Sequence, residues 1–163
     1  MFKAITIGGK EYHLEYTVEA ALYGDATQKL MDFIIQTATA SSSGDADRAA
    51  IIKENLRAVS DVPQTAMTLF YAGLLEHHGT FGDGTVKSLT DAKRLVAQYF
   101  RDHADDGTGN FMDILTMCLD QMGEDGFFKT IGLEKMFAQT EEEEAAPEPA
   151  KISAARKKKA TEK

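Results

Sequence analysis

The sequence predicts a mainly helical fold with a short β-hairpin at its N-terminus. Apolar residues alternate on both sides of Gly8-Gly9-Lys10: Ile5 and Ile7 precede it, and Tyr12, Leu14, Tyr16 and Val18 follow it. Alternation with period two around a glycine pair is typical of a hairpin. Beyond Val18 the apolar residues recur at helical spacing. We therefore expect a hairpin followed by a bundle of about five to six helices.

The first helix is expected to begin at Thr17 or Val18. Gly24-Asp25 lies within its apolar pattern, and glycine there favours a break. The segment from Thr37 to Gly44 contains only Thr, Ala, Ser and Gly, and this composition predicts a flexible loop.

Two helices are expected around Pro63. Asp45 or Asp47 is a suitable N-cap for the first of them, and the second begins at Pro63, which fits the first turn of a helix. A single kinked helix is the alternative. We favour two, because the residue before a proline avoids helical angles.

Three further helices are predicted from caps and turns. Ser88-Leu-Thr-Asp91 resembles a capping box with Asp in place of Glu, and Asn110 is a suitable N-cap for the next helix. After the turn at Gly123–Gly126, a sixth short helix is expected over Phe127–Phe137.

Composition divides the chain into a domain over residues 1–140 and a tail over 141–163. The net charge of −8 lies entirely in the first part, with 12 Lys and Arg against 20 Asp and Glu. An acidic body is poorly suited to bind nucleic acid. The tail runs from Glu141–Glu144 to Arg156–Lys159 with a single large apolar residue, Ile152, so we expect it to be disordered.

The chain carries no recognisable catalytic or cofactor motif. Adjacent residues on a helix point about 100° apart, so His77 and His78 do not converge on one metal ion, and a polar helix end explains them better. Asp102–Asp113 lacks an oxygen ligand at its third position and is a poor calcium loop. The single cysteine, Cys118, lies in an apolar run and is expected to pack as a small hydrophobe. We expect no enzyme activity, no cofactor and no metal.

Partner binding is the function that remains, although an enzyme of an unrecognised helical class is a weaker alternative. No apolar run approaches the roughly 20 residues of a membrane span, so we expect a soluble cytosolic protein. The last apolar segment contains residues suited to grip an apolar helix of another chain, although a helix docked on the core is the simpler interpretation. These candidate partner-binding residues are Phe127, Phe128, Met136 and Phe137.

Three soft motifs occur in a fixed order along residues 3–138. Tyr12-x-Leu-x-Tyr-Thr-x-Glu-Ala20 follows the hairpin, Thr68-Leu-Phe-Tyr-Ala-Gly-Leu-Leu-Glu-His-His-Gly79 comes next, and Asp91-Ala-Lys-Arg-Leu-Val-Ala-Gln-Tyr-Phe100 is the third. This order resembles the tail assembly chaperones of long-tailed bacteriophages and prophages. Tyr71 to Leu75 is the most specific part of the resemblance.

The resemblance implies a non-enzymatic helper in phage morphogenesis. Such proteins bind the tape-measure protein in the host bacterial cytoplasm, keep it soluble, help recruit tail-tube subunits, and are absent from the mature virion. Many are also made in a longer form by ribosomal frameshifting, and Lys157–Lys159 is a candidate for such a site. The alternative is a small structural or tail-completion protein of the particle. The Ser-rich segment 37–44 departs from the commonest pattern, and the oligomeric state stays open.

Overall fold

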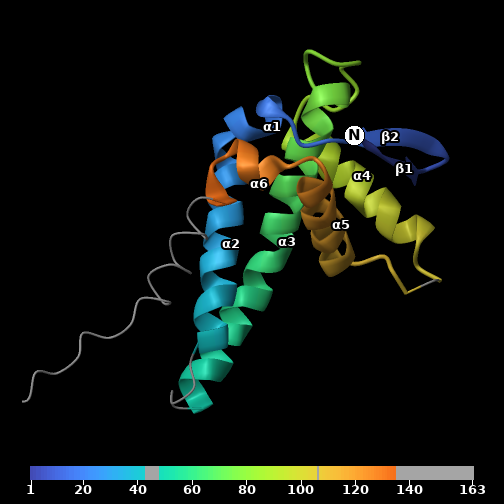
Figure 1. Cartoon of the computed structure of the whole chain (residues 1–163). Helices are drawn as coiled ribbons and strands as arrows, with labels where there is room; N and C mark the ends of the chain where they lie inside the picture. Colours follow the sequence, from blue (N-terminus) through green and yellow to red (C-terminus); the bar gives the residue numbers. More distant parts are fainter. Residues whose placement is uncertain (43–47, 106, 135–163) are drawn as a thin grey trace, which may run out of the picture.

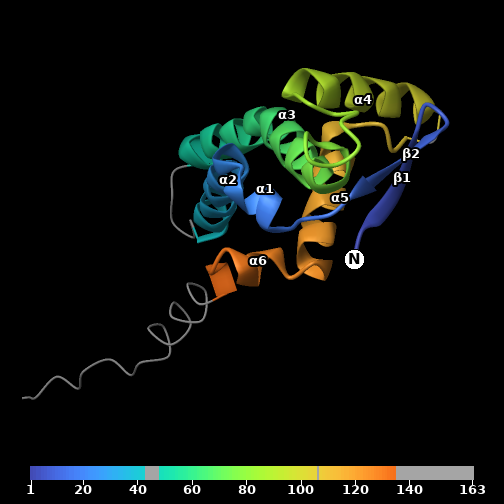
Figure 2. The same ribbon diagram turned by 90° about the horizontal axis from the view of Figure 1, so that it is seen from above.

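The computed structural model describes residues 1–42, 48–105 and 107–134, and for residues 37–42 and 48–59 the backbone alone. Two antiparallel strands are followed by six helices, as the sequence predicts. The hairpin and α2 lie on opposite sides of the molecule, with α3 between them (Figures 1 and 2).

The hairpin consists of β1 (Lys3–Ile7) and β2 (Lys10–Leu14), paired so that Ile5 faces Tyr12 and Ile7 faces Lys10. Its two-residue turn needs positive φ at both positions, and Gly8 and Gly9 supply φ values of 58° and 75°. The alternating residues Ile5, Ile7, Tyr12 and Leu14 are all buried. The predicted hairpin and its inward face are therefore confirmed.

Helix α1 (Val18–Leu22) begins after Thr17, whose hydroxyl accepts the N–H of Glu19, and α2 (Gly24–Ser42) follows the expected break. The loop predicted at Thr37–Gly44 is wrong for residues 37–42, because α2 continues to Ser42. A helix already formed adds a turn at small cost, Ala favours the helix, and Ser and Thr oppose it by only about 0.5 kcal/mol each. Residues 43 and 44 lie outside the described part.

Helix α3 (Arg48–His78) is a single helix with Pro63 inside it, so the prediction of two helices is wrong. Proline removes one helical hydrogen bond and disfavours helical angles at Val62. Val62 is buried, and α3 packs against α2, α5 and β2. This packing offsets the local preference. The proposed caps Asp45 and Asp47 are outside the described residues.

The predicted caps of the next two helices are confirmed. Helix α4 (Leu89–Asp102) begins after Ser88, whose hydroxyl accepts the N–H of Asp91 while the Asp91 carboxylate accepts the Ser88 hydroxyl. Helix α5 (Phe111–Glu124) begins after Asn110, whose side-chain oxygen accepts the N–H groups of Met112 and Asp113.

The predicted sixth helix is interrupted within its described part. Helix α6 spans Phe127–Thr130 and ends before Gly132, whose φ of 82° lies outside the helical region, and Leu133 and Glu134 are again helical. Residues 135–137, and the whole tail predicted to be disordered, lie outside the described residues.

Within the described chain, no helix combines the length and apolar character needed to span a membrane.

Candidate functional site

Of the four partner-binding residues predicted from sequence, the structure describes Phe127 and Phe128. Phe127 is fully buried, with its ring centroid 5.5 Å from that of Tyr16, and the half-buried Phe128 packs against the core. Met136 and Phe137 lie outside the described residues. In this arrangement Phe127 belongs to the core, so binding through these four residues stays a prediction that would require α6 to move.

An open groove of about 600 Å³ lies elsewhere, above the middle of α3. Its floor is formed by α3, one wall by the start of α2, and the other wall by the first turns of α4 and α5. The lining combines apolar and charged side chains, and the groove is concave enough to hold part of another chain. Its lining residues are Tyr23, Asp25, Gln28, Lys29, Asp32, Pro63, Gln64, Met67, Thr68, Leu89, Lys93 and Phe111.

A second hollow of about 260 Å³ adjoins the groove and shares Tyr23 with it. Two of its apolar lining residues stand out into solvent: Leu22 is 76% exposed and Phe81 is 89% exposed. Large apolar side chains at such exposure, grouped around a hollow, are typical of interaction sites. We call the groove and this hollow together the α3 groove.

Three residues on one face of α3 contribute to the floor: Met67 lines the larger groove, and Tyr71 and Leu75 line the second hollow. They follow each other at intervals of four, along about 12 Å of the helix, and Met67 and Tyr71 are buried. The ring of Tyr71 meets that of Tyr23 edge-on at 5.3 Å, and its hydroxyl donates to the carbonyl of Lys87 at 3.2 Å. These contacts hold the middle of the floor in place.

Both acidic and basic side chains line the groove, and its tyrosines are neutral. Burial raises the pKa of Tyr23, with a further contribution from nearby Asp25, and burial with Asp91 raises the pKa of Tyr71. Charge in the groove therefore comes from Asp25, Asp32, Lys29 and Lys93 on its walls. A groove with both apolar and charged lining residues suits an amphipathic partner.

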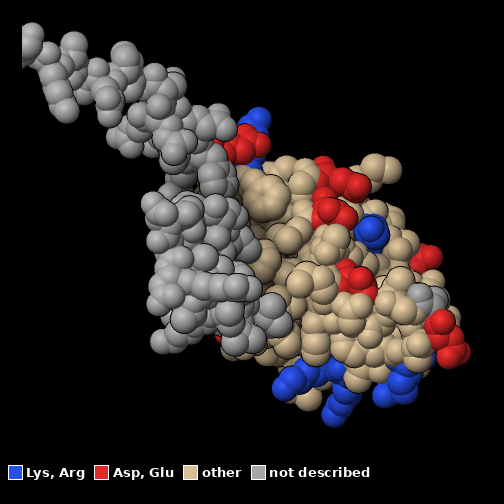
Figure 3. All heavy atoms as spheres, turned by 90° about the horizontal axis from the view of Figure 1, so that it is seen from below, with Lys and Arg blue, Asp and Glu red and all other residues tan. Residues whose placement is uncertain are grey.

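Charge is also segregated on the surface of the molecule. Figure 3 shows Lys and Arg gathered along the edge where α4 lies, whereas Asp and Glu are spread over the rest of that face. The exposed basic residues of α4 are Lys93, Arg94 and Arg101.

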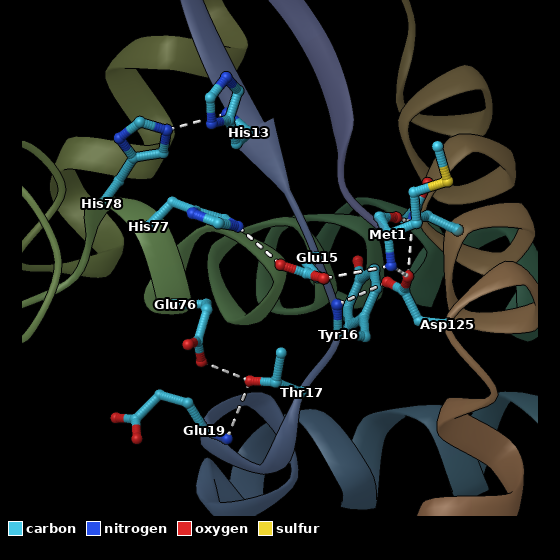
Figure 4. A network of polar contacts seen from close by, with 11 residues as sticks. Met1, His13, Glu15, Tyr16, Thr17, Glu19, Glu76, His77, His78 and Asp125 are labelled. Atoms are coloured by element: carbon cyan, nitrogen blue, oxygen red, sulfur yellow. Dashed lines mark hydrogen bonds and ion pairs between the residues drawn. The ribbon is translucent and has the colours of Figure 1, made fainter.

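A polar network ties the hairpin to the end of α3 (Figure 4). The N–H of His13 donates to Nε2 of His78 at 2.8 Å, and Nδ1 of His78 lies 2.8 Å from an Asp83 carboxylate oxygen. Since Nε2 accepts, the ring proton is on Nδ1 and is donated to Asp83. Nε2 of His77 lies 2.7 Å from Glu15. The predicted polar helix end thus also contacts β2, and local sequence patterns do not predict such a long-range contact.

The same network reaches α5 through Asp125. Its side chain is 3% exposed and accepts the N–H of Tyr16 at 2.8 Å, Nε2 of Gln121 at 2.8 Å and the amino group of Met1 at 2.9 Å. Burial opposes the charge of this carboxylate, but the hydrogen bonds, first that from Tyr16, outweigh burial and lower its pKa. The network therefore holds structural elements together.

The Cys118 thiol is buried, and two carboxylates that flank the turn after α4 have structural roles. Burial raises the pKa of the Cys118 thiol to about 12, so the thiol is protonated and packs as predicted. Asp102 accepts the N–H of Gly8 at 2.6 Å, and Asp113 lies in the N-terminal turn of α5. In the part of the chain that the structure describes, no three His, Cys, Asp or Glu side chains are placed to hold a metal ion.

Sequence patterns do not predict the α3 groove. An apolar face such as that of Met67, Tyr71 and Leu75 is equally expected of a core helix. Tyr23, Leu89, Lys93 and Phe111 come together only through the packing of four elements.

Comparison with models of known protein families, with characterised proteins and with solved structures gives no match.

Proposed function

We propose that this chain is a non-enzymatic assembly chaperone that holds an apolar helical segment of another protein in the α3 groove. The observation that carries the proposal is the pair of hollows along α3 that share Tyr23. Met67 lines the larger one, and Tyr71 and Leu75 line the smaller one. Apolar grooves of this kind take the apolar face of an amphipathic helix.

The resemblance to phage tail assembly chaperones suggests the identity of the client. We propose that it is the tape-measure protein, a long helical chain, bound in the host bacterial cytoplasm before tail assembly, with tail-tube subunits as further partners. The net charge of −8 supports such a role, because a charged carrier helps to keep an apolar client in solution.

Co-expression tests this proposal. The chain is produced together with the longest helical protein encoded nearby, and the soluble fraction and co-purification of that protein are scored. We expect the client to be soluble and to co-purify with the unchanged chain. An insoluble client that does not co-purify contradicts the proposal.

Variants locate the contact. Leu22→Ser with Phe81→Ser removes two exposed apolar side chains of the groove, and we expect most of the co-purified client to be lost. Ile35→Ser is the matched control, because Ile35 is 55% exposed and does not line the groove. Equal loss in both variants would contradict a role for the groove. Detection of the chain in purified virions by mass spectrometry would favour a structural component instead.

A further inference from the structure

Three of the four histidines of the chain lie together between β2 and the end of α3 (Figure 4). The ring centroid of His13 lies 5.3 Å from that of His77 and 5.9 Å from that of His78, and the last two are 6.4 Å apart. We call these three rings the histidine cluster. Each ring has a carboxylate beside it, and these belong in the same order to Glu11, Glu15 and Asp83.

The surroundings of His78 determine which of its ring nitrogens carries the proton. Nδ1 lies 2.8 Å from a carboxylate oxygen of Asp83 and 3.3 Å from the hydroxyl oxygen of Thr85. The Thr85 hydroxyl donates its own proton to Asp83 at 2.6 Å, so both neighbours of Nδ1 are acceptors. Nε2 accepts the N–H of His13 at 2.8 Å. The contact between β2 and α3 therefore requires a neutral His78 ring with its proton on Nδ1.

A second proton on this ring has to go to Nε2, the atom that accepts the N–H of His13. Two N–H groups would then face each other across the 2.8 Å that separates the nitrogen atoms. His78 is 6% exposed, so water has little access to the new donor, and a buried donor without an acceptor is unfavourable. Protonation thus keeps the bond from His78 to Asp83 and removes the bond to β2.

We infer that the histidine cluster is a pH-sensitive switch at the contact between the hairpin and α3. The neutral ring of His78 holds the N–H of His13, and its protonation releases the part of β2 around His13 from α3. Protonation of the adjacent His13 and His77 rings adds repulsion between like charges in the same direction. Clustered histidines are a common means by which proteins respond to pH between about 5 and 8. The inference concerns the chain by itself and goes beyond the binding of a client.

The buried carboxylates near the cluster stay ionised in that pH range. Burial opposes the charge of Glu15, Asp83 and Asp125, but hydrogen bonds outweigh it and lower the pKa of all three. The pKa of the Met1 amino group is raised, first by its hydrogen bond to Asp125. The histidines are therefore the groups whose charge we expect to change. The charged groups that face the cluster are Lys10, Glu11 and Glu15 of β2, Asp83 of the loop after α3, Asp125 next to α5, and the amino group of Met1.

The next contacts along the chain do not depend on a histidine. The N–H of Glu15 donates to the carbonyl of Gly73 at 2.9 Å, and that of Tyr16 donates to Asp125 at 2.8 Å. Leu14, which precedes them, is fully buried. We therefore expect the opening to be local, with the chain after β2 still attached to α3.

Amide hydrogen exchange of the unchanged chain, measured by NMR, tests the inference. Rates at about pH 7.5 and about pH 5.5 are corrected for the intrinsic effect of pH on exchange. We expect the protection of the His13 amide to fall about tenfold, as loss of one hydrogen bond to a buried partner implies. The Glu15 amide is the internal control and should keep its protection. Nitrogen-15 spectra of the rings should show Nε2 of His78 gaining its proton with the same midpoint.

Variants assign the switch to one ring. His78→Gln places an amide oxygen, which accepts a hydrogen bond and does not titrate, where Nε2 lies. We expect this variant to protect the His13 amide equally at both pH values. His103→Gln is the matched control, because the ring of this fourth histidine packs against Tyr99 of α4. It should keep the pH dependence of the unchanged chain.

The inference is overturned if the His13 amide keeps its protection at the lower pH, or if the His13 and Glu15 amides lose protection together. It is also overturned if His78→Gln keeps the pH dependence while His77→Gln or His103→Gln abolishes it. The exchange rates and ring spectra come from the unchanged chain, so they decide the question even if His78→Gln fails to fold.

Discussion

At the scale of single residues, close contact between the hairpin and α3 depends on the absence of one side chain. A Cβ atom added at Gly73 would lie 2.5 Å from Cδ1 of Leu14 and 2.9 Å from Cζ of Tyr16. Both neighbours are buried, and the Tyr16 hydroxyl donates to the carbonyl of Leu69 at 3.0 Å. Neither side chain has free space to move into.

We therefore expect Gly73→Ala to lower the free energy of unfolding by about 1–3 kcal/mol, the usual cost of overfilling a packed core. Urea denaturation followed by circular dichroism measures the change. Gly123→Ala is the matched control, because it lies in α5 with open space around it. There the same substitution should raise stability by about 0.5–1 kcal/mol. Equal effects at both sites would contradict the close packing at Gly73.

At the scale of elements, α3 remains helical through Pro63, and the proline lowers the stability of the helix there. The proline lacks the N–H that would otherwise donate to the carbonyl of residue 59, and its ring crowds that turn. The buried neighbours Val62 and Ala66 hold the helix against the core nonetheless.

Replacing this proline tests the cost. We expect Pro63→Ala to raise the free energy of unfolding by about 1–3 kcal/mol, because one hydrogen bond is restored and one steric clash is removed. Chemical denaturation gives the value, and far-ultraviolet circular dichroism checks that the helix content is retained. A loss of stability would mean that the bend at Pro63 is needed for packing against α2 and α5.

Sequence patterns are sufficient to predict where several of the helices begin. Thr17, Ser88 and Asn110 identify helix starts because a cap is a local interaction among residues within three positions. The break before Pro63 was predicted wrongly because the local preference against helical angles, less than a few kcal/mol, is outweighed by the packing of α3. The loop at 37–42 was predicted wrongly because the existing helix α2 extends through these residues. The α3 groove is a product of tertiary packing, so local sequence patterns do not predict it.

At the scale of the whole molecule, stability depends on carboxylates whose pKa is lowered. Partial burial of Asp83 opposes its charge, but hydrogen bonds from Thr85 and His78 outweigh burial and bring its pKa to about 2. The pKa is also lowered for Glu15, chiefly by His77 against the effect of burial, for Asp91 by Ser88, for Asp102 by the N–H of Gly8, and for Asp125.

A carboxylate with a lowered folded pKa stabilises the protein above its unfolded pKa of about 4, and this contribution is lost as pH falls through the folded value. We expect the urea midpoint to fall steadily as the pH is lowered below about 4. In the Asp83→Asn variant the lowest part of the decline should be shallower. A midpoint that does not change on acidification would contradict these ionised contacts.

The bonds that fasten β2 to α3 have a consequence for aggregation. The N–H of His13 donates to His78, and that of Glu15 donates to the carbonyl of Gly73 at 2.9 Å, so these outward donors on that side of the hairpin are already used. A strand edge with unpaired donors is a template for intermolecular β-pairing. Helix α3 therefore covers this edge of β2. Another chain that adds a strand to the sheet is expected to pair with β1 instead.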